Sequence, residues 1–132
     1  MPSEGRVCDE DSTLEGEAMK TKPAEMTVEQ YRLSITHDEL QGSIIEIATA
    51  LGYENYFTWR SYHSPAGFPD LWLARERDVR LVIIEVKTEK DELSPAQQKW
   101  INVLTLIASV NNTIDVSVVR PSNYDECIEK LK

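Results

Sequence analysis

The stretch GFPDLWLARERDVRLVIIEVK (residues 67–87) decides the fold expected for this chain. It holds two largely apolar runs, 70–74 and 81–86, and the charged connection 75–78 between them is short enough for a hairpin. The pattern therefore predicts two strands that pair side by side in a sheet.

Asp70 and Glu85 are expected to lie next to each other in this hairpin. Gly67 permits a tight turn and Pro69 stiffens the entry to the first strand, so Asp70 is held at a fixed point. Both residues lie far from the turn, Asp70 five residues before the connection and Glu85 seven residues after it. Because side chains alternate along a strand, Lys87 projects from the same face as Glu85.

Two neighbouring carboxylates repel each other unless a cation lies between them. Hard carboxylate oxygens without Cys or paired His ligands favour Mg²⁺ or Mn²⁺. Such ions support hydrolysis of a phosphodiester bond, with Lys87 as an electrostatic stabiliser and the backbone carbonyl of Val86 as a further oxygen ligand. The alternative is that Asp70, Glu85 and Lys87 form a structural ion-pair network.

The residues before the hairpin predict a helix and a strand. Apolar residues recur at helical spacing from Leu40 to Leu51, with a capping box of Thr36 and Glu39 at the start and Gly52 as a stop. An aromatic, partly alternating run at 56–62 predicts a strand.

The residues after the hairpin predict a helix, a strand and a final helix. Ser94-Pro95-Ala96-Gln97 is a strong helix start. Its apolar face is expected to comprise Trp100, Val103, Leu104 and Ile107. A strand at 114–119 and a helix at 123–132, capped by Ser122, complete the order α-β-β-β-α-β-α. This order predicts an α/β fold, a mixed β-sheet flanked by helices.

The composition fits one globular domain of 132 residues with a net charge of −9. Residues 1–34 hold 8 acidic and 4 basic residues, a net of −4, and read as a flexible leader with a short helical stretch at 28–32. Residues 35–132 hold 15 acidic and 10 basic residues, a net of −5. This excess of negative charge argues against tight nonspecific binding to DNA.

Cysteine content and hydropathy narrow the class of protein. Cys8 and Cys127 lie at opposite ends of the chain without metal-ligand spacing, so both are expected to be plain thiols. No apolar run reaches the length of a membrane span, and no signal peptide is recognisable, which makes a cytosolic location the expectation.

From Leu40 to Asp125 the sequence resembles the VRR-NUC branch of the PD-(D/E)xK nucleases, which have a restriction-endonuclease-like core. The resemblance rests on 67–71, 84–89 and 93–97, together with Arg120-Pro121-Ser122 and Tyr124-Asp125. It implies that residues 35–132 form a divalent-metal-dependent, structure-selective DNA endonuclease. Small standalone members, often encoded by phages, are similar to Holliday-junction resolvases and act as homodimers; larger relatives serve DNA repair. A bacterial or phage-infected cell is the expected setting.

The resemblance also assigns roles to single residues. Asp70 and Glu85 become metal ligands, Lys87 the catalytic lysine, and Gln97 matches a family glutamine, although a capping box explains it equally well. The family usually has a glutamate on the first helix, four residues before a glutamine. Here Gln41 is preceded at that distance by His37, a weak or indirect metal partner or a purely structural residue.

The loop before the hairpin offers candidate DNA contacts. Arg60 and His63 are expected to bind phosphates, whereas Trp59 and Tyr62 are expected to pack in the core. A catalytically weak or inactive DNA-binding or assembly module on the same fold is the alternative to an active nuclease.

Overall fold

The computed structural model describes residues 25–58 and 65–132. The elements of this part of the chain are α1 (Val28–Ser34), α2 (His37–Ala50), β1 (Glu54–Phe57), β2 (Leu71–Arg75), β3 (Arg80–Val86), α3 (Pro95–Ser109), β4 (Ile114–Val119), the 3₁₀ turn η3 (Pro121–Asn123) and α4 (Tyr124–Leu131). The predicted order of helices and strands is confirmed, and so is the short helix expected at 28–32. No helix in the described part of the chain is long and apolar enough to cross a membrane.

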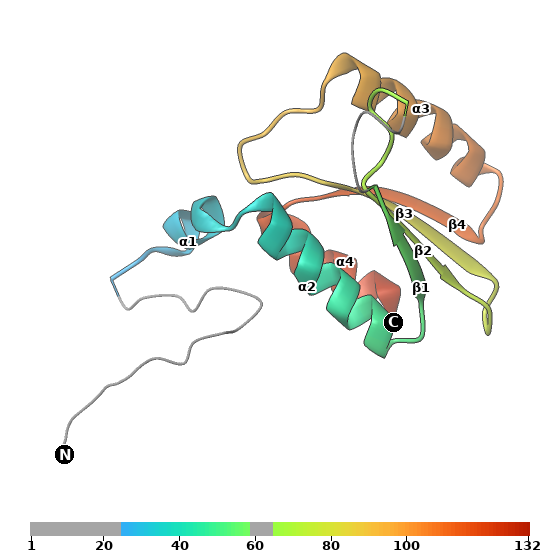
Figure 1. The fold of residues 1–132 in the computed structure, drawn as a ribbon, viewed down its shortest axis with the longest axis horizontal. Helices are drawn as coiled ribbons and strands as arrows, with labels where there is room; N and C mark the ends of the chain where they lie inside the picture. The colour runs from blue at the N-terminus through green and yellow to red at the C-terminus, as the bar shows by residue number, and fades with distance from the viewer. Residues whose placement is uncertain (1–24, 59–64) are drawn as a thin grey trace.

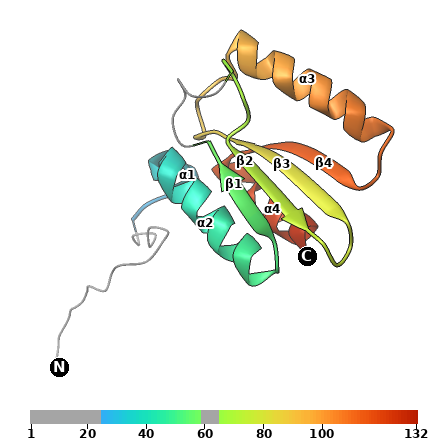
Figure 2. The same cartoon turned by 45° about the vertical axis from the view of Figure 1, so that its right-hand side comes forward.

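The four strands form one mixed sheet in the order β1-β2-β3-β4. β1, β2 and β3 are antiparallel neighbours, and β4 runs parallel to β3 after the α3 crossover. α2 and α4 lie on one side of the sheet and α3 on the other (Figures 1 and 2). The fold is therefore the predicted mixed sheet flanked by helices, consistent with a restriction-endonuclease-like core.

The core lies between the sheet and the pair α2 and α4. Leu40, Ile44 and Ala48 of α2 are fully buried, at the helical spacing seen in the sequence. The sheet presents alternate residues of β2 and β3 to them, and α4 adds two more. The buried strand and α4 residues of this cluster are Leu71, Leu73, Val82, Ile84, Val86, Val119, Cys127 and Leu131.

The capping signals of two helices are confirmed. The Thr36 side chain accepts a hydrogen bond from the Glu39 amide, while the Glu39 side chain accepts one from the Thr36 amide. Gly52 follows α2 with a φ of 93°, the left-handed conformation of a helix stop. Ser94 and Gln97 make the equivalent reciprocal pair at the start of α3.

Several boundaries differ from the prediction, and β2 begins at Leu71, one residue after Asp70. The first strand spans Glu54–Phe57, and residues 59–62 of the predicted strand lie outside the described residues. β2 extends through Arg75, so the hairpin turn is 76–79, because the buried guanidinium of Arg75 binds Asp78 across it. Ser122 does not cap the last helix: its amide donates to Glu89, and a 3₁₀ turn intervenes before α4.

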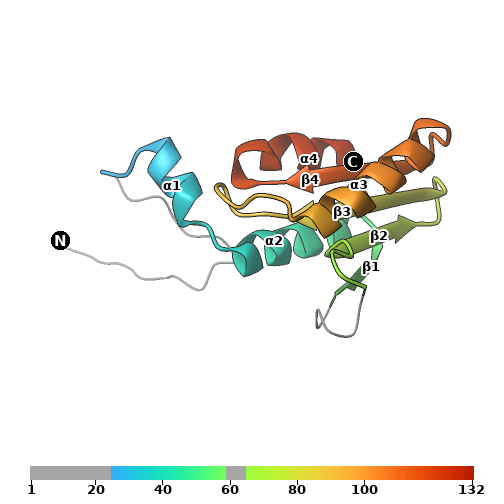
Figure 3. The same cartoon turned by 90° about the horizontal axis from the view of Figure 1, so that it is seen from above.

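The predicted apolar face of α3 is largely open. None of its fifteen residues is buried, and Val103 and Ile107 are each 47% exposed. The helix packs against β4, and near its start Phe68, which stacks on Trp72, contacts Trp100 edge-on. Figure 3, seen from above, shows α3 in front of the sheet, α4 beside β4, and α1 leading into the start of α2.

Cys127 is a free, buried thiol, as expected, and burial raises its pKa to about 11. Cys8 lies outside the described residues. The thiol of Cys127 is therefore a packing group between α4 and the sheet.

Leu40→Ala is expected to lower the free energy of unfolding by about 2–5 kcal/mol, because it opens a cavity at a fully buried position. Urea denaturation followed by tryptophan fluorescence measures the loss. Leu33→Ala, at a position 41% exposed, is the matched control and should lose clearly less. Equal losses in the two variants would contradict this account of the core.

Candidate active site

The pairing of β2 with β3 brings Asp70 beside Glu85. Leu71 pairs with Ile84, so Asp70, one residue before the strand, lies level with Glu85. Alternation puts Ile84 and Val86 in the core, and Glu85 and Lys87 on the opposite face. The hairpin geometry expected from the sequence is present.

Asp70 is held by two donors that share one of its oxygens. The Val86 amide donates to Asp70 Oδ2 at 3.0 Å, and His37 Nε2 lies 3.3 Å from the same oxygen. Asp70 Oδ1 takes no part in either contact. His37 is the first residue of α2, so the start of that helix is tied directly to the hairpin.

Glu85 is a buried carboxylate, only 2% exposed. Gln97 Nε2 donates to Glu85 Oε2 at 3.1 Å, while Gln97 Oε1 accepts from the Ser94 amide at 2.8 Å. The capping box therefore sets the orientation of the Gln97 amide and points its NH₂ group at Glu85. The two readings of Gln97 from the sequence are compatible, since one side chain makes both contacts.

Glu85 Oε1 has no hydrogen-bond partner among the described residues and is inaccessible to solvent. An unpaired oxygen of a buried carboxylate is costly, because the desolvation penalty has nothing to offset it. A cation bound between Glu85 and Asp70 would offset it.

Gly67 joins the Asp70 loop to the start of α3. Its φ is 77°, and a Cβ atom at this position would lie 2.4 Å from the Ala96 carbonyl carbon and 2.5 Å from the Gln97 amide nitrogen. Only glycine permits this backbone approach. The loop that delivers Asp70 and the helix turn that delivers Gln97 are thus packed backbone to backbone.

The electrostatics of the carboxylates favour one shared proton. Burial, and then the nearby Asp70 carboxylate, raise the pKa of Glu85 to about 8 against the opposing charge of Lys87. Burial also raises the pKa of Asp70, but the hydrogen bonds from His37 and Val86 outweigh it and the net shift is downward. The hydrogen bond to Asp70 raises the pKa of His37 despite partial burial. Without a cation, the proton therefore resides on Glu85.

The donor set is sparse. The described ranges contain no group of three or more His, Cys, Asp and Glu side chains that could hold a metal ion. Mg²⁺, however, is commonly held by one or two carboxylates and completes its shell with water. Asp70, Glu85 and a backbone carbonyl suit Mg²⁺ or Mn²⁺ and do not suit a closed zinc site.

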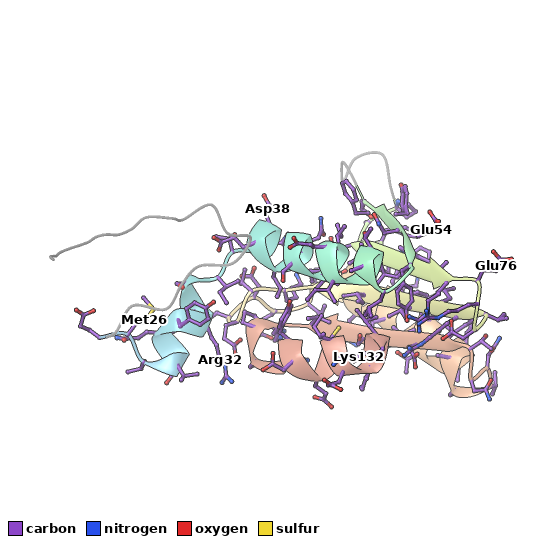
Figure 4. All side chains as sticks on the ribbon, turned by 90° about the horizontal axis from the view of Figure 1, so that it is seen from below. Met26, Arg32, Asp38, Glu54, Glu76 and Lys132 are labelled. Atoms are coloured by element: carbon purple, nitrogen blue, oxygen red, sulfur yellow. The ribbon has the colours of Figure 1, made fainter. Side chains whose placement is uncertain are left out.

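Two exposed acidic residues, Asp38 and Glu76, lie outside the site. Asp38, 98% exposed, points away from the body at the start of α2, as Figure 4 shows. Glu76, in the β2–β3 turn, lies at the right-hand end of the molecule in Figure 4, at the end opposite Met26. Arg60 and His63, with Trp59 and Tyr62, lie outside the described residues, so their expected roles stay predictions.

One site contact was not foreseen from the sequence. The Val86 amide holds Asp70, whereas only the Val86 carbonyl was considered as a ligand. Every residue except proline has a main-chain amide, so the residue type at position 86 does not indicate this hydrogen bond. The Glu85–Gln97 contact, in contrast, follows from the capping box once α3 is placed over β3.

Residues 16–120 match the VRR-NUC domain family, so the chain belongs to this family. The family implies a nuclease of the PD-(D/E)xK type, a class that cleaves phosphodiester bonds in DNA and generally uses a divalent metal. No curated protein and no solved structure matches the chain.

Without metal, the raised pKa of Glu85 makes stability depend on pH. Because the folded-state pKa of about 8 exceeds the ordinary value, this contribution is complete below the unfolded-state pKa and is lost as pH rises through about 8. We expect Glu85→Gln to gain in free energy of unfolding relative to wild type between pH 5 and 9, measured by urea denaturation in EDTA.

Excess Mg²⁺ is the companion measurement, since a cation that binds folded protein stabilises it. It should restore wild-type stability at pH 9 and leave Glu85→Gln nearly unchanged. Parallel curves for the two proteins across the pH range would show that Glu85 does not hold the proton.

Proposed function

We propose that this protein is a divalent-metal-dependent, structure-selective DNA endonuclease. In its most specific form, the proposal is that the protein resolves Holliday junctions. The buried Glu85, with one oxygen unpaired beside Asp70, is the observation that carries the proposal. The net charge of −9 argues against tight nonspecific binding to DNA, because such binding depends on neutralising phosphates.

Asp70 and Glu85 would hold Mg²⁺ or Mn²⁺, with the Val86 carbonyl as a third protein oxygen. Bound there, the ion supplies a nucleophilic water at neutral pH and stabilises charge on the scissile phosphate. The contacts from His37 and Val86 keep Asp70 Oδ2 engaged, which orients Oδ1. Gln97 orients Glu85 in the same way through Oε2. In this arrangement His37 supports Asp70, and a direct bond from His37 to metal is the weaker assignment.

Lys87 is assigned the role of electrostatic stabiliser. It follows Val86 on the Glu85 face, and its charge lowers the pKa of Glu85, so the two groups interact. Its amide donates to the Val119 carbonyl at 2.9 Å, which anchors the main chain at the end of the sheet. The ammonium would orient the attacking water or neutralise charge that develops on the phosphate.

A catalytically weak or inactive DNA-binding module is the second candidate. His37 stands where the family usually has a glutamate, and residues 35–132 carry a net charge of −5. The placement of Asp70 level with the buried Glu85 weighs against it, since a module without a cation gains nothing from two carboxyl groups side by side.

Asp70→Asn and Lys87→Ala should each reduce cleavage about 100-fold or more while circular dichroism and thermal stability show a folded protein. The assay uses a junction, a flap, a duplex and a single strand, with Mg²⁺, Mn²⁺ or EDTA. Asp125→Asn, at an exposed position in the first turn of α4, is the matched control and should cleave like wild type.

Cleavage by Asp70→Asn at the wild-type rate would refute the catalytic assignment. If wild type cuts none of the substrates and calorimetry detects neither Mg²⁺ nor Mn²⁺ binding, the inactive module is the correct reading.

We propose that the protein acts as a homodimer. Symmetric cleavage of two strands needs two related sites. α3 carries no buried residue; Leu106 on the helix is 71% exposed, and Val110, its C-cap, is 86% exposed. Such an apolar surface on a helix suits a second copy of this chain.

Light scattering after size exclusion should report a dimer for wild type, and Leu106→Glu should shift it to monomer because a charge would be buried in the interface. Val28→Glu, 52% exposed on α1, is the control and should remain dimeric. A monomeric wild type at micromolar concentration would exclude the dimer.

A further inference from the structure

The loop 88–93 joins the two halves of the site. It follows Lys87 at the end of the sheet and ends at Ser94, the N-cap of α3. The loop has no regular structure, and no backbone–backbone hydrogen bond ties it to the rest of the described chain. Its position therefore depends on side chains.

Arg120 supplies those contacts. It follows β4 directly, and its Nη1 donates to the Thr88 carbonyl at 2.8 Å and to the Asp91 carbonyl at 2.5 Å. One nitrogen with two hydrogens satisfies both carbonyls. Close by, the Ser122 amide donates to the Glu89 side chain at 3.1 Å. Together Arg120 and Ser122 hold the loop at three points.

The Arg120 contacts continue the attachment of Lys87. The Lys87 amide already donates to the Val119 carbonyl, and Arg120 donates to the carbonyl of the next residue, Thr88. Val119 and Arg120, at the end of β4, thus make hydrogen bonds with two successive residues, Lys87 and Thr88. Hydrogen bonds from a guanidinium are charge-assisted and stronger than neutral ones, which suits a loop that lacks other support.

The geometry points to Arg120 as a positioning residue for catalysis. By fixing the loop it sets the direction of Lys87 at one end and the start of α3, and hence Gln97 on Glu85, at the other. It also restrains the carboxylates of the loop, Glu89, Asp91 and Glu92, which would repel a DNA phosphate if they swung over Lys87. This inference rests on the proposed nuclease function.

A direct contact between Arg120 and DNA is the competing role. The two roles differ in what they change. A phosphate contact contributes to substrate binding, whereas a clamp on the loop changes the rate at saturating substrate and leaves binding intact.

Arg120→Ala tests the inference, with Arg77→Ala, an exposed arginine in the β2–β3 turn, as the matched control. We expect kcat to fall about 10- to 100-fold, the effect of a small displacement of a reacting group, while affinity for junction DNA in Ca²⁺ changes less than about twofold. Hydrogen exchange should accelerate at the amides that flank the loop, those of Lys87 and Ser94, which donate to the Val119 carbonyl and to Gln97 Oε1. Methylguanidine should restore part of the rate of Arg120→Ala, and methylammonium at equal concentration should not.

Unchanged exchange at the amides of Lys87 and Ser94 in a folded Arg120→Ala protein would overturn the clamp, whatever the activity. A weaker DNA affinity with unchanged kcat would overturn it in favour of a phosphate contact. A wild-type protein that cuts no DNA substrate would contradict the proposed nuclease function, and this outcome is distinct from a failure of the clamp. In that event faster exchange would leave Arg120 as a loop clamp, but the catalytic role assigned to it would fall.

Discussion

The register between β2 and β3 is the constraint on which the rest of the site depends. Leu71 opposite Ile84 puts Asp70 level with Glu85. A slip of one residue would turn Glu85 into the core and Ile84 out of it, because side chains alternate with a period of two. The apolar residues that α2 and α4 cover hold the register, so the core that stabilises the fold also aligns the carboxylates.

The burial of Glu85 opposes stability. A well-packed apolar residue would serve the sheet better, because a buried carboxylate loses hydration and here keeps one oxygen unpaired. The surrounding structure holds the group despite this, through Gln97 on one side and the neighbouring strand on the other. Such an arrangement is typical of a cation-binding site, and it supports the metal-dependent chemistry that the family implies.

The start of α3 is where several supports meet. Gly67 packs its backbone on Ala96, the capping box turns Gln97 toward Glu85, and Arg120 holds the loop that leads into the helix. α3 also packs against β4, with Ile101 and Leu104 half-buried, whereas Leu106 is 71% exposed. The helix is thus anchored near the site and against β4, and its exposed apolar residues are available for contacts with another molecule.

Much of the fold and the carboxylate pair followed from the sequence. Local signals determine the hairpin, the caps at Thr36 and Ser94, and the alternation that sends Glu85 and Lys87 to one face, because each depends on neighbours within a few residues. The family resemblance is carried by the same segments, and residues 16–120 match that family.

Only the tertiary structure decided how the supports of the site are connected. The contact of His37 with Asp70 spans 33 positions, and that of Arg120 with Thr88 spans 32. The exposure of α3 also depended on packing, since an apolar stripe predicts a helix but not what covers it. Contacts between distant segments, and donors that belong to the main chain, arise from the packing of whole elements, and no periodicity along the chain records them.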